Sequence, residues 1–450
     1  MKKISFEIKS FYTKYEHLII IGLLLFGLVL RIGLTLNVDE PIDRDALEYY
    51  SIAKNIVNQH SFSIDGENPT ARRSPGYPVF IAISMKIVSQ SPTNVYIVQA
   101  IINILTALLV YLSLKKLPVN PLIRIITTIL FLFSTTFVFV NVFYAVVITM
   151  FVMAILLYLS IENTHVKNDT IRTALLGFLI GILILLRPTF LYLPVFIVIV
   201  SIGMSLFLNK QYLRESIIIT LVALCVVLPW SIRNVIVFQQ WIPLVNAGGG
   251  ELWQANLEIE NRTVWYSVTD IAKYEQQRTE SAELQAKLRS EYSQKNNLNS
   301  VIELNQLLKQ KAVEIIRQHP VRYGILCINR FLIFWFSPPI GSTTLKSISP
   351  ILFWLALFIK YILTLCSIIG LYLIARDNWQ KYQIIILTVI YLTLIHSAVH
   401  AIQRYFLPLI PIVYFGLGYY LYIQLFIKRK GRQVILKKSP LSFAMSKISR

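Results

Sequence analysis

Apolar runs of about twenty residues recur along this chain from residue 18 almost to residue 427. An α-helix rises about 1.5 Å per residue, so about 20 apolar residues cross a hydrocarbon core of about 30 Å. The chain is 55% hydrophobic and only 15% charged, with a mean hydropathy of +0.60, which excludes a soluble enzyme of this length. The first run, 18–36, is long and lacks a small-residue cleavage site, so we do not expect a cleaved signal peptide. The sequence therefore predicts an all-α polytopic membrane protein.

The net charge of +20 alone would suggest an anionic partner such as nucleic acid. The basic residues instead flank the apolar runs, as the positive-inside rule requires of cytoplasmic segments. They are Lys2, Lys3, Lys9, Lys14, Lys115, Lys116, Arg124, Lys428, Arg429, Lys430, Arg432, Lys437 and Lys438. We expect the lipid bilayer as a partner and no nucleic acid.

Counting runs and loop charges together predicts about ten transmembrane helices with both termini in the cytoplasm of a plasma-membrane protein. The predicted spans are 18–36, 94–114, 122–139, 142–160, 172–187, 189–208, 215–232, 350–374, 382–399 and 405–427. Two shorter apolar segments, 78–88 with Lys86 and 323–336 with Asn329 and Arg330, are predicted to be interfacial helices.

This layout divides the chain into three parts. Residues 1–237 form an N-terminal transmembrane module whose outer-face loop, 37–78, carries the active site. Residues 238–322 form one small extracytoplasmic domain, and residues 323–450 hold an interfacial helix, three spans and a basic tail. The middle part serves either acceptor recognition, through aromatic residues such as Trp253 and Trp265, or as a lid.

The same layout brings most of the unusual polar residues to the outer side. They are Asp45, Arg72, Arg73, Arg187, Arg233, His319, His396, His400 and Arg404. Ionisable groups at membrane depth are costly, so their gathering at one level indicates a single functional site.

Asp45 begins an amphipathic segment, 46–57, and has Glu48 three residues later, a spacing like that of a capping box. One interpretation is that Asp45 accepts hydrogen bonds from the helix N-terminal amides. The other is that an outward carboxylate acts as a general base on an acceptor hydroxyl. The spacing does not exclude the nearby Asp39, Glu40 and Asp43 from the second role.

Arg72 and Arg73 precede the segment 74–78, where two prolines and a glycine predict a rigid turn. A guanidinium held by a rigid turn suits bidentate binding of a phosphate. The alternative is that these arginines pair with lipid headgroups. Arg187 and Arg233 have the same two interpretations, as phosphate ligands or as interface anchors.

His396 and His400 are four residues apart and are predicted to share a helix face, with Arg404 one turn further along. The His-x3-His spacing permits a metal, but no carboxylate is near in sequence as a third ligand. The three cysteines, Cys225, Cys327 and Cys366, have no CxxC spacing and predict neither a zinc site nor a disulfide framework. We expect no cofactor, and a divalent metal is unsupported.

Several motifs, taken in order, resemble bacterial glycosyltransferase family 39, whose members are GT-C membrane enzymes related to protein O-mannosyltransferases and to the lipid A aminoarabinose transferase. The motifs cover nearly the whole chain: Asp45-x3-Tyr49-x2-Ile52-Ala53, Arg73-Ser74-Pro75-Gly76-Tyr77-Pro78, Arg187-Pro188-Thr189, Leu228-Pro229-Trp230-Ser231-Ile232-Arg233-Asn234, Glu251-Leu252-Trp253-Gln254-Ala255-Asn256, His319-Pro320-Val321-Arg322-Tyr323 and Arg404-Tyr405-Phe406-Leu407-Pro408.

The resemblance implies an enzyme that moves a sugar from a polyprenyl-phosphate donor to an acceptor hydroxyl on the outer face, with inversion and without a nucleotide. It implies Asp45 as the base, and Arg72 or Arg73 at the phosphate, with the choice between the two left open. The other candidate phosphate ligands are Arg404, Arg187 and Arg233. The candidate substrate contacts are Tyr49, Tyr77, His396, His400, Tyr405 and Trp253. The sugar and the acceptor, whether protein, lipid or glycan, are not identified by the sequence.

Two positions depart from the family pattern. Ala46 follows Asp45 where relatives often have a glutamate, and Tyr144 to Val147 lacks the acidic residue often found at the start of the fourth span. The rival function is a transporter or flippase of lipid-linked glycans or solutes, for which charged or broken-helix sites at mid-membrane would be expected. A polymerase or ligase of surface glycans would share the lipid-phosphate donor.

Overall fold

The structure is a computed structural model that describes residues 2–37, 42, 44–161, 169–207, 211–261, 264–267, 272–293, 298–338 and 342–427. Asp39, Glu40 and Asp43, the carboxylates that compete with Asp45 in the sequence, lie outside the described residues, as does the basic tail after residue 427.

The described residues are helical apart from short connections, and their only bridge of β type is the isolated pair Ser63 and Pro69. The first half contains α1 (Lys2–Asn37), α2 (Arg44–Gln59), α3 (Gly76–Ile87), α4 (Pro92–Lys115), α5 (Pro121–Leu132), η1 (Thr135–Asn141), α6 (Val146–Ile161), α7 (Asp169–Leu186), η2 (Pro188–Phe190), α8 (Leu193–Phe207) and α9 (Gln211–Phe238). The second half contains α10 (Gly248–Asn256), α11 (Glu258–Asn261), α12 (Ala272–Ser293), α13 (Leu298–Gln318), α14 (Pro320–Phe336), α15 (Ser342–Ile348), α16 (Pro350–Asp377), α17 (Trp379–Ala398), α18 (Gln403–Phe406), η3 (Leu407–Leu409), α19 (Ile410–Tyr422) and η4 (Ile423–Ile427).

Within the described residues, seven helices are long and apolar enough to cross a membrane, and they match the first, second and sixth to tenth predicted spans. The third predicted span is a pair, α5 and η1, bent by 43°. The fourth and fifth correspond to the shorter apolar helices α6 and α7. The predicted all-α polytopic membrane fold is confirmed, with some of its spans shorter or more broken than expected.

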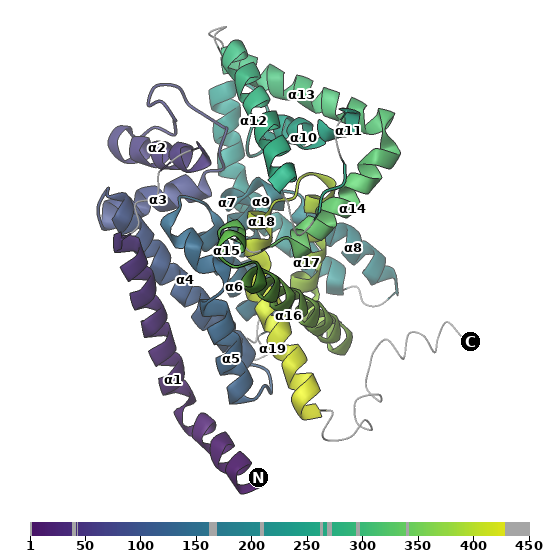
Figure 1. Cartoon of the computed structure of the whole chain (residues 1–450). Coiled ribbons are helices and arrows are strands. Elements are labelled where there is room, and N and C mark those ends of the chain that lie inside the picture. Colours follow the sequence, from purple (N-terminus) through teal and green to yellow (C-terminus); the bar gives the residue numbers. More distant parts are fainter. Residues whose placement is uncertain are drawn as a thin grey trace, which may run out of the picture.

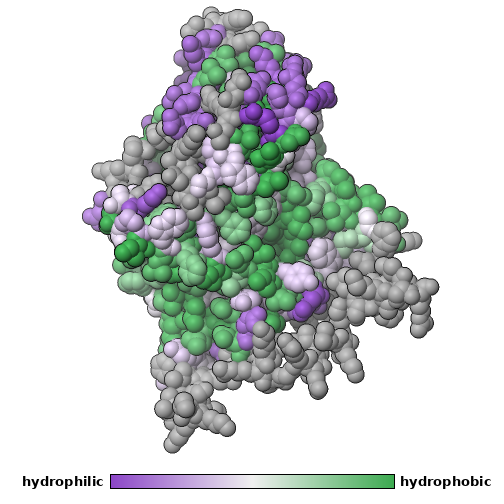
Figure 2. All heavy atoms as spheres, turned by 45° about the vertical axis from the view of Figure 1, so that its right-hand side comes forward, coloured by the Kyte–Doolittle hydropathy of each residue, from purple (hydrophilic) through white to green (hydrophobic). Residues whose placement is uncertain are grey.

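The polar and apolar parts of the molecule are separated along its long axis. The N-terminus lies at the lower end in Figure 1, whereas α2, α10, α12 and α13 lie at the upper end. Figure 2 shows a broad hydrophobic band over the bundle and hydrophilic side chains gathered at the top. Helix α2 and the helices α10, α12 and α13 therefore lie at the same end of the bundle.

A buried arginine that the sequence analysis did not consider stabilises the bend between α5 and η1. Arg31 of α1 is 2% exposed and donates to the Leu132 carbonyl at 2.8 Å, to Asn103 Oδ1 at 2.9 Å and to the Gly27 carbonyl at 3.0 Å. A carbonyl at a helix end has no amide partner in its own helix, so a donor from α1 satisfies it. All three bonds are internal to the bundle, which gives Arg31 a structural role.

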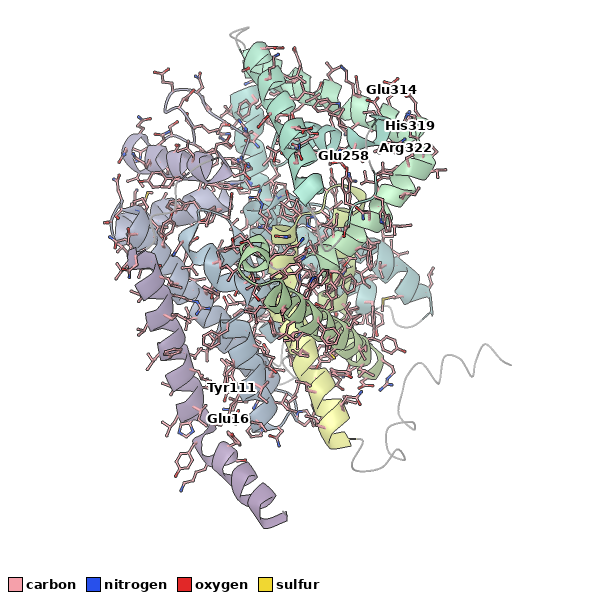
Figure 3. The ribbon with its side chains drawn as sticks, viewed as in Figure 1. Glu16, Tyr111, Glu258, Glu314, His319 and Arg322 are labelled. Atoms are coloured by element: carbon pink, nitrogen blue, oxygen red, sulfur yellow. The ribbon has the colours of Figure 1, made fainter. Side chains whose placement is uncertain are left out.

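At the lower end of the bundle α1 is joined to α5 by a second polar contact. Arg124 donates through Nε and Nη2 to the two carboxylate oxygens of Glu16, each at 2.6 Å. Glu16 lies beside Tyr111 of α4 (Figure 3). Bidentate pairs of this kind fix geometry as well as adding energy, so α1 is held in register with α4 and α5.

Gly76 lets the start of α3 lie against the end of α7. A Cβ at Gly76 would lie 2.8 Å from both the carbonyl carbon and the oxygen of Leu185, which are backbone atoms. We expect Gly76→Ala to lower the free energy of unfolding by about 1–3 kcal/mol, since overpacking against backbone forces a shift. Thermal unfolding in detergent measures this. Gly33→Ala in α1, where a Cβ would meet nothing within 4 Å, is the matched control and should be near neutral; equal effects of the two substitutions would contradict the close approach.

Candidate active site

Asp45 and Glu48 lie in the first turns of α2, a helix that buries apolar side chains. Ala46, Ile52 and Ala53 are buried, and α2 packs on α3. Residues three apart on a helix are neighbours, so the two carboxylates point the same way, toward the loop that follows α2. The amphipathic segment predicted after Asp45 is confirmed.

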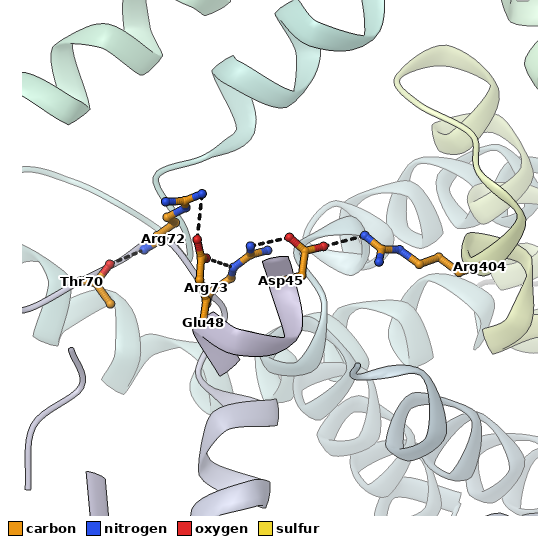
Figure 4. A network of polar contacts seen from close by, with 6 residues as sticks. All are labelled: Asp45, Glu48, Thr70, Arg72, Arg73 and Arg404. Atoms are coloured by element: carbon orange, nitrogen blue, oxygen red, sulfur yellow. Dashed lines mark hydrogen bonds and ion pairs between the residues drawn. The ribbon is translucent and has the colours of Figure 1, made fainter. Parts of the chain in front are cut away.

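Asp45 bridges two arginines that are far apart in the sequence (Figure 4). Arg73 Nη2 donates to Asp45 Oδ1 at 2.6 Å, and Arg404 Nη2 donates to Asp45 Oδ2 at 2.6 Å. Burial alone would raise the pKa of Asp45, but the two guanidinium charges outweigh it and hold the pKa well below its ordinary value. Both carboxylate oxygens are therefore engaged by arginines, and the described contacts of Asp45 include no hydrogen bond from a helix amide.

Glu48 forms the second half of this cluster, whereas the sequence suggested it only as a capping-box partner of Asp45. Its Oε2 accepts from Arg73 Nε at 2.5 Å, and its Oε1 pairs with Arg72 Nη2 at 2.9 Å. Arg73 thus contacts both carboxylates. Burial alone would lower the pKa of Arg73, but the nearby Tyr49, Asp45 and Glu48 raise it. The signal that could have identified Glu48 is its spacing of three from Asp45.

The loop that carries Arg72 and Arg73 is held in place on the side away from α2. Arg233 of α9 donates to the Thr70 carbonyl at 2.9 Å, and the Asn246 amide donates to the Ala71 carbonyl at 2.8 Å. The guanidinium of Arg233 also lies 4.8 Å from the Trp230 ring centroid. The described contacts of Arg233 are with this loop, with Asn234 and with its aromatic neighbours rather than with the Asp45 cluster, so Arg233 anchors the loop that carries Arg72 and Arg73.

Aromatic side chains line the cluster. Arg73 lies over the Tyr49 ring at 5.1 Å, and Tyr49 meets Tyr77 edge to face at 5.1 Å between centroids. Tyr77 is fully buried and donates to Gln99 Oε1 at 2.8 Å, so it supports the Tyr49 ring. On the other side Arg404 lies 4.5 Å from the Tyr144 ring centroid. Tyr144 therefore packs on Arg404 at the start of the fourth span, where relatives often place an acid.

Arg187 and Tyr405 extend the cluster toward α7. Arg187 lies between α7 and η2, close enough to Arg404, Tyr405 and Tyr49 to interact electrostatically. Tyr405 also interacts with Glu251 of α10, which the sequence analysis named only as part of a motif. Among the described residues, no hydrogen bond or ion pair is made by the Arg187 guanidinium.

His396 and His400 do not share a helix face, so that prediction is wrong. Helix α17 ends at Ala398, and His400 lies in the connection to α18. Both rings are buried, with His396 Nδ1 at 3.0 Å from the His400 carbonyl and the Tyr405 ring 4.7 Å from that of His396. The two histidines pack around Tyr405. No group of three or more metal-ligating side chains occurs within the described part of the chain.

Trp253, a candidate substrate contact, is largely buried in this structure. It is 6% exposed, whereas Trp265 is 51% exposed. The motif around Trp253 instead holds α10 to α14 and α17: Arg330 Nη1 donates to Asn256 Oδ1 at 3.3 Å and to the Ala398 carbonyl at 3.2 Å. His319 begins α14, at its junction with α13, and lies with Arg322 at the upper right in Figure 3.

Part of the chain matches one family model, and several solved structures are similar to the chain. Residues 72–232 match the family model described as dolichyl-phosphate-mannose-protein mannosyltransferase. This range contains Arg72, Arg73 and Arg187 but neither Asp45 nor Arg404. A search of curated proteins found no match.

Solved structures resemble the chain over most of its length. An oligosaccharyltransferase from Archaeoglobus fulgidus, in complex with Zn and sulfate, is 12% identical with a TM-score of 0.48, covering 95% of this chain and 51% of its own. The archaeal oligosaccharyltransferase AglB from the same organism, in complex with an inhibitory peptide and a dolichol-phosphate, is 12% identical with a TM-score of 0.49, covering 97% and 54%. ArnT from Cupriavidus metallidurans bound to undecaprenyl phosphate is 12% identical with a TM-score of 0.42, covering 89% and 77%.

The chain spans about half the length of the solved oligosaccharyltransferases that it matches. At this level of identity nothing about substrates or site residues passes from these proteins to this one. Over residues 72–232, the family match agrees with the resemblance to protein O-mannosyltransferases expected from the sequence.

Proposed function

We propose that the protein transfers a sugar from a polyprenyl-phosphate donor to an acceptor hydroxyl, with inversion, at the cluster around Asp45. The observation that supports this most is the convergence of Arg73 and Arg404 on one carboxylate at the polar end of a membrane bundle. Guanidinium groups in a partly buried site are the donors that best match a phosphate.

The net positive charge of the cluster stabilises the negative charge that develops on the donor phosphate as the sugar leaves. Three arginines, Arg72, Arg73 and Arg404, face two carboxylates, so the paired cluster has a net charge of +1. Arg187 adds a further positive charge nearby. A phosphate diester gains negative charge when its sugar departs, so fixed positive charge stabilises the transition state more than the bound donor.

Asp45 is the proposed base, which takes the proton from the acceptor hydroxyl as that oxygen attacks the sugar. The Asp45 side chain is 31% exposed, compared with 16% for Glu48, the other acid of the cluster. Positioning of donor and acceptor in one site supplies much of the remaining rate. The sugar and acceptor are outside this proposal, and no metal or other cofactor is invoked.

The proposed orientation puts the cluster on the outer face of the plasma membrane and the termini in the cytoplasm. It rests on the basic residues at the lower end, such as Lys115 and Arg124, which the positive-inside rule assigns to the cytoplasm. In this orientation the region 238–322 covers the site from outside and recognises the acceptor or serves as a lid. A transporter would be expected to use charge at membrane depth, but Arg31 is bound only to groups inside the bundle.

The direct test is transfer by the purified full chain in lipid nanodiscs, supplied with a lipid extract that contains polyprenyl-phosphate sugars. The expected result is release of free polyprenyl phosphate that depends on the protein and on an acceptor. Movement of intact donor across the bilayer without release of phosphate would instead identify a flippase.

The pKa of Asp45 leads to a prediction about pH. Because the folded pKa lies below the ordinary value of about 3.9, the stabilisation from the ionised carboxylate is complete above that value and is lost as pH falls through the folded pKa. The difference in melting temperature between the wild type and Asp45→Asn should therefore stay constant from about pH 8 to pH 5 and change only below about pH 4. A difference that already changes between pH 7 and pH 5 would mean that the arginines do not hold Asp45 ionised.

A further inference from the structure

The two carboxylates of the cluster make different kinds of contact with the arginines. Glu48 binds Arg72 and Arg73, which are neighbours in the sequence and belong to one anchored loop. Asp45 instead connects Arg73 of that loop with Arg404 of α18, which lies 359 residues further along the chain than Asp45. The contact of Glu48 is local, whereas that of Asp45 joins two segments that could also be joined by a ligand.

The two carboxylate side chains also differ in exposure, and Asp45, the residue that joins distant segments, is the more exposed. The side chain of Asp45 is 31% exposed and that of Glu48 is 16% exposed. Asp45 receives one hydrogen bond from each arginine through terminal nitrogens, while Glu48 holds the Nε of Arg73. The side chains of Arg73 and Arg404 are 18% and 24% exposed, and Arg73 can exchange partners at Nη2 while its Nε stays on Glu48.

We propose that Glu48 is a positioning residue that keeps Arg72 and Arg73 in place, and that Asp45 is the exchangeable partner which the donor phosphate displaces from Arg73 and Arg404. This inference rests on the proposed function. A phosphate oxygen would take the position of each Asp45 oxygen, because both groups accept from the same two nitrogens. Asp45 is then released to act on the acceptor only when a donor is bound.

The exchange resolves a conflict between geometry and chemistry. A carboxylate that accepts from two arginines is a weak base, because its charge is already stabilised. Once the donor phosphate accepts the hydrogen bonds of Arg73 and Arg404, the Asp45 carboxylate lies beside the negative phosphate and becomes more basic. The donor should therefore bind before the acceptor is activated, which limits loss of the donor to water.

Two substitutions that remove the same charge should have opposite effects on phosphate binding. Asp45→Asn removes the internal competitor, so the arginines are available for a larger fraction of the time and apparent affinity rises in proportion. Glu48→Gln removes the group that holds Arg73 and Arg72, so preorganisation of the phosphate site is lost. If only net charge mattered, both variants would bind phosphate more tightly and by a similar factor.

The experiment measures binding of farnesyl phosphate, with farnesol as the uncharged match, to the full chain in nanodiscs by isothermal titration. We expect Asp45→Asn to bind farnesyl phosphate at least about tenfold more tightly than the wild type and Glu48→Gln to bind it about threefold or more weakly. Glu48→Asp should restore part of the loss. Asp65→Asn should leave binding unchanged, since the hydrogen bonds to the Asp65 carboxylate come from its loop neighbours Ser63, Glu67 and Asn68.

The outcomes distinguish the two proposals. Affinities of Asp45→Asn and Glu48→Gln that agree within threefold would overturn the division of roles, as would weaker binding by Asp45→Asn. A wild type that binds farnesyl phosphate no better than farnesol would instead remove the proposed function. Melting temperatures of all variants are measured alongside, and a Glu48→Gln variant that fails to fold leaves the comparison of Asp45→Asn with the wild type as the decisive one.

Discussion

Asp45→Asn is expected to lower the rate of sugar transfer by about 10²–10⁴-fold, the range that positioned general bases contribute. The amide keeps the shape of the side chain and can still accept from one arginine, but it cannot remove a proton. The measurement is release of polyprenyl phosphate by the purified variant at saturating donor and acceptor. The fold should be retained, because Asp45 is only partly buried and the neighbouring Glu48 still holds Arg73.

Asp65→Asn is the matched control for this substitution. Asp65 lies in the same loop region, and its carboxylate bonds only to nearby residues, among them Ser63 and Asn68. Its transfer rate should stay within about threefold of the wild type, since a surface substitution away from the site costs little. Undiminished transfer by Asp45→Asn would reject Asp45 as the base.

Arg404→Ala is expected to lower kcat/KM for the donor by about 10²-fold, which corresponds to about 3 kcal/mol of transition-state stabilisation. The change removes a phosphate donor and leaves Asp45 with Arg73 as its one arginine partner. The KM for the donor should rise more than the KM for the acceptor, because the guanidinium is proposed to bind phosphate. Initial rates at varied donor and acceptor concentrations separate the two.

Arg376→Ala controls for loss of an arginine from the bundle. Arg376 pairs with Asp377 at 2.8 Å at the end of α16, apart from the cluster. It should leave the donor KM unchanged. If Arg404→Ala also left the donor KM unchanged while lowering the melting temperature, Arg404 would be a structural residue that packs on Tyr144.

The fold was predictable from the sequence because spanning length and loop charge act locally. Each run of about 20 apolar residues is a span whatever its neighbours are, and the basic flanks orient it. The structural role of Arg31 could not be predicted in this way, since one cation hardly changes the mean hydropathy of the long apolar run 18–36. Its partners Asn103 and Leu132 come from two other helices, and only packing brings them together.

The site was predictable in part. Asp45, Arg73 and Arg404 were expected at one end of the bundle, and the structure brings them into contact. The end of α17 was not predictable, because no glycine or proline stands between Ser397 and His400. The helix ends where Arg330 and Tyr323 of α14 donate to the Ala398 carbonyl, a tertiary contact without a local signal.

Burial of aromatic side chains likewise depends on packing. Trp253 and Trp265 look alike in the sequence, as aromatic residues in a polar region. One is buried beneath α13 and the other is exposed.

Mass spectrometry of surface glycans and lipids tests the central claim most directly, in cells that lack the protein and in the same cells complemented with the wild type or with Asp45→Asn. We expect one glycosylated product to be absent without the protein, restored by the wild type and still absent with Asp45→Asn, while the polyprenyl-phosphate sugar accumulates. Restoration of that product by Asp45→Asn, or no missing product at all, would contradict the account.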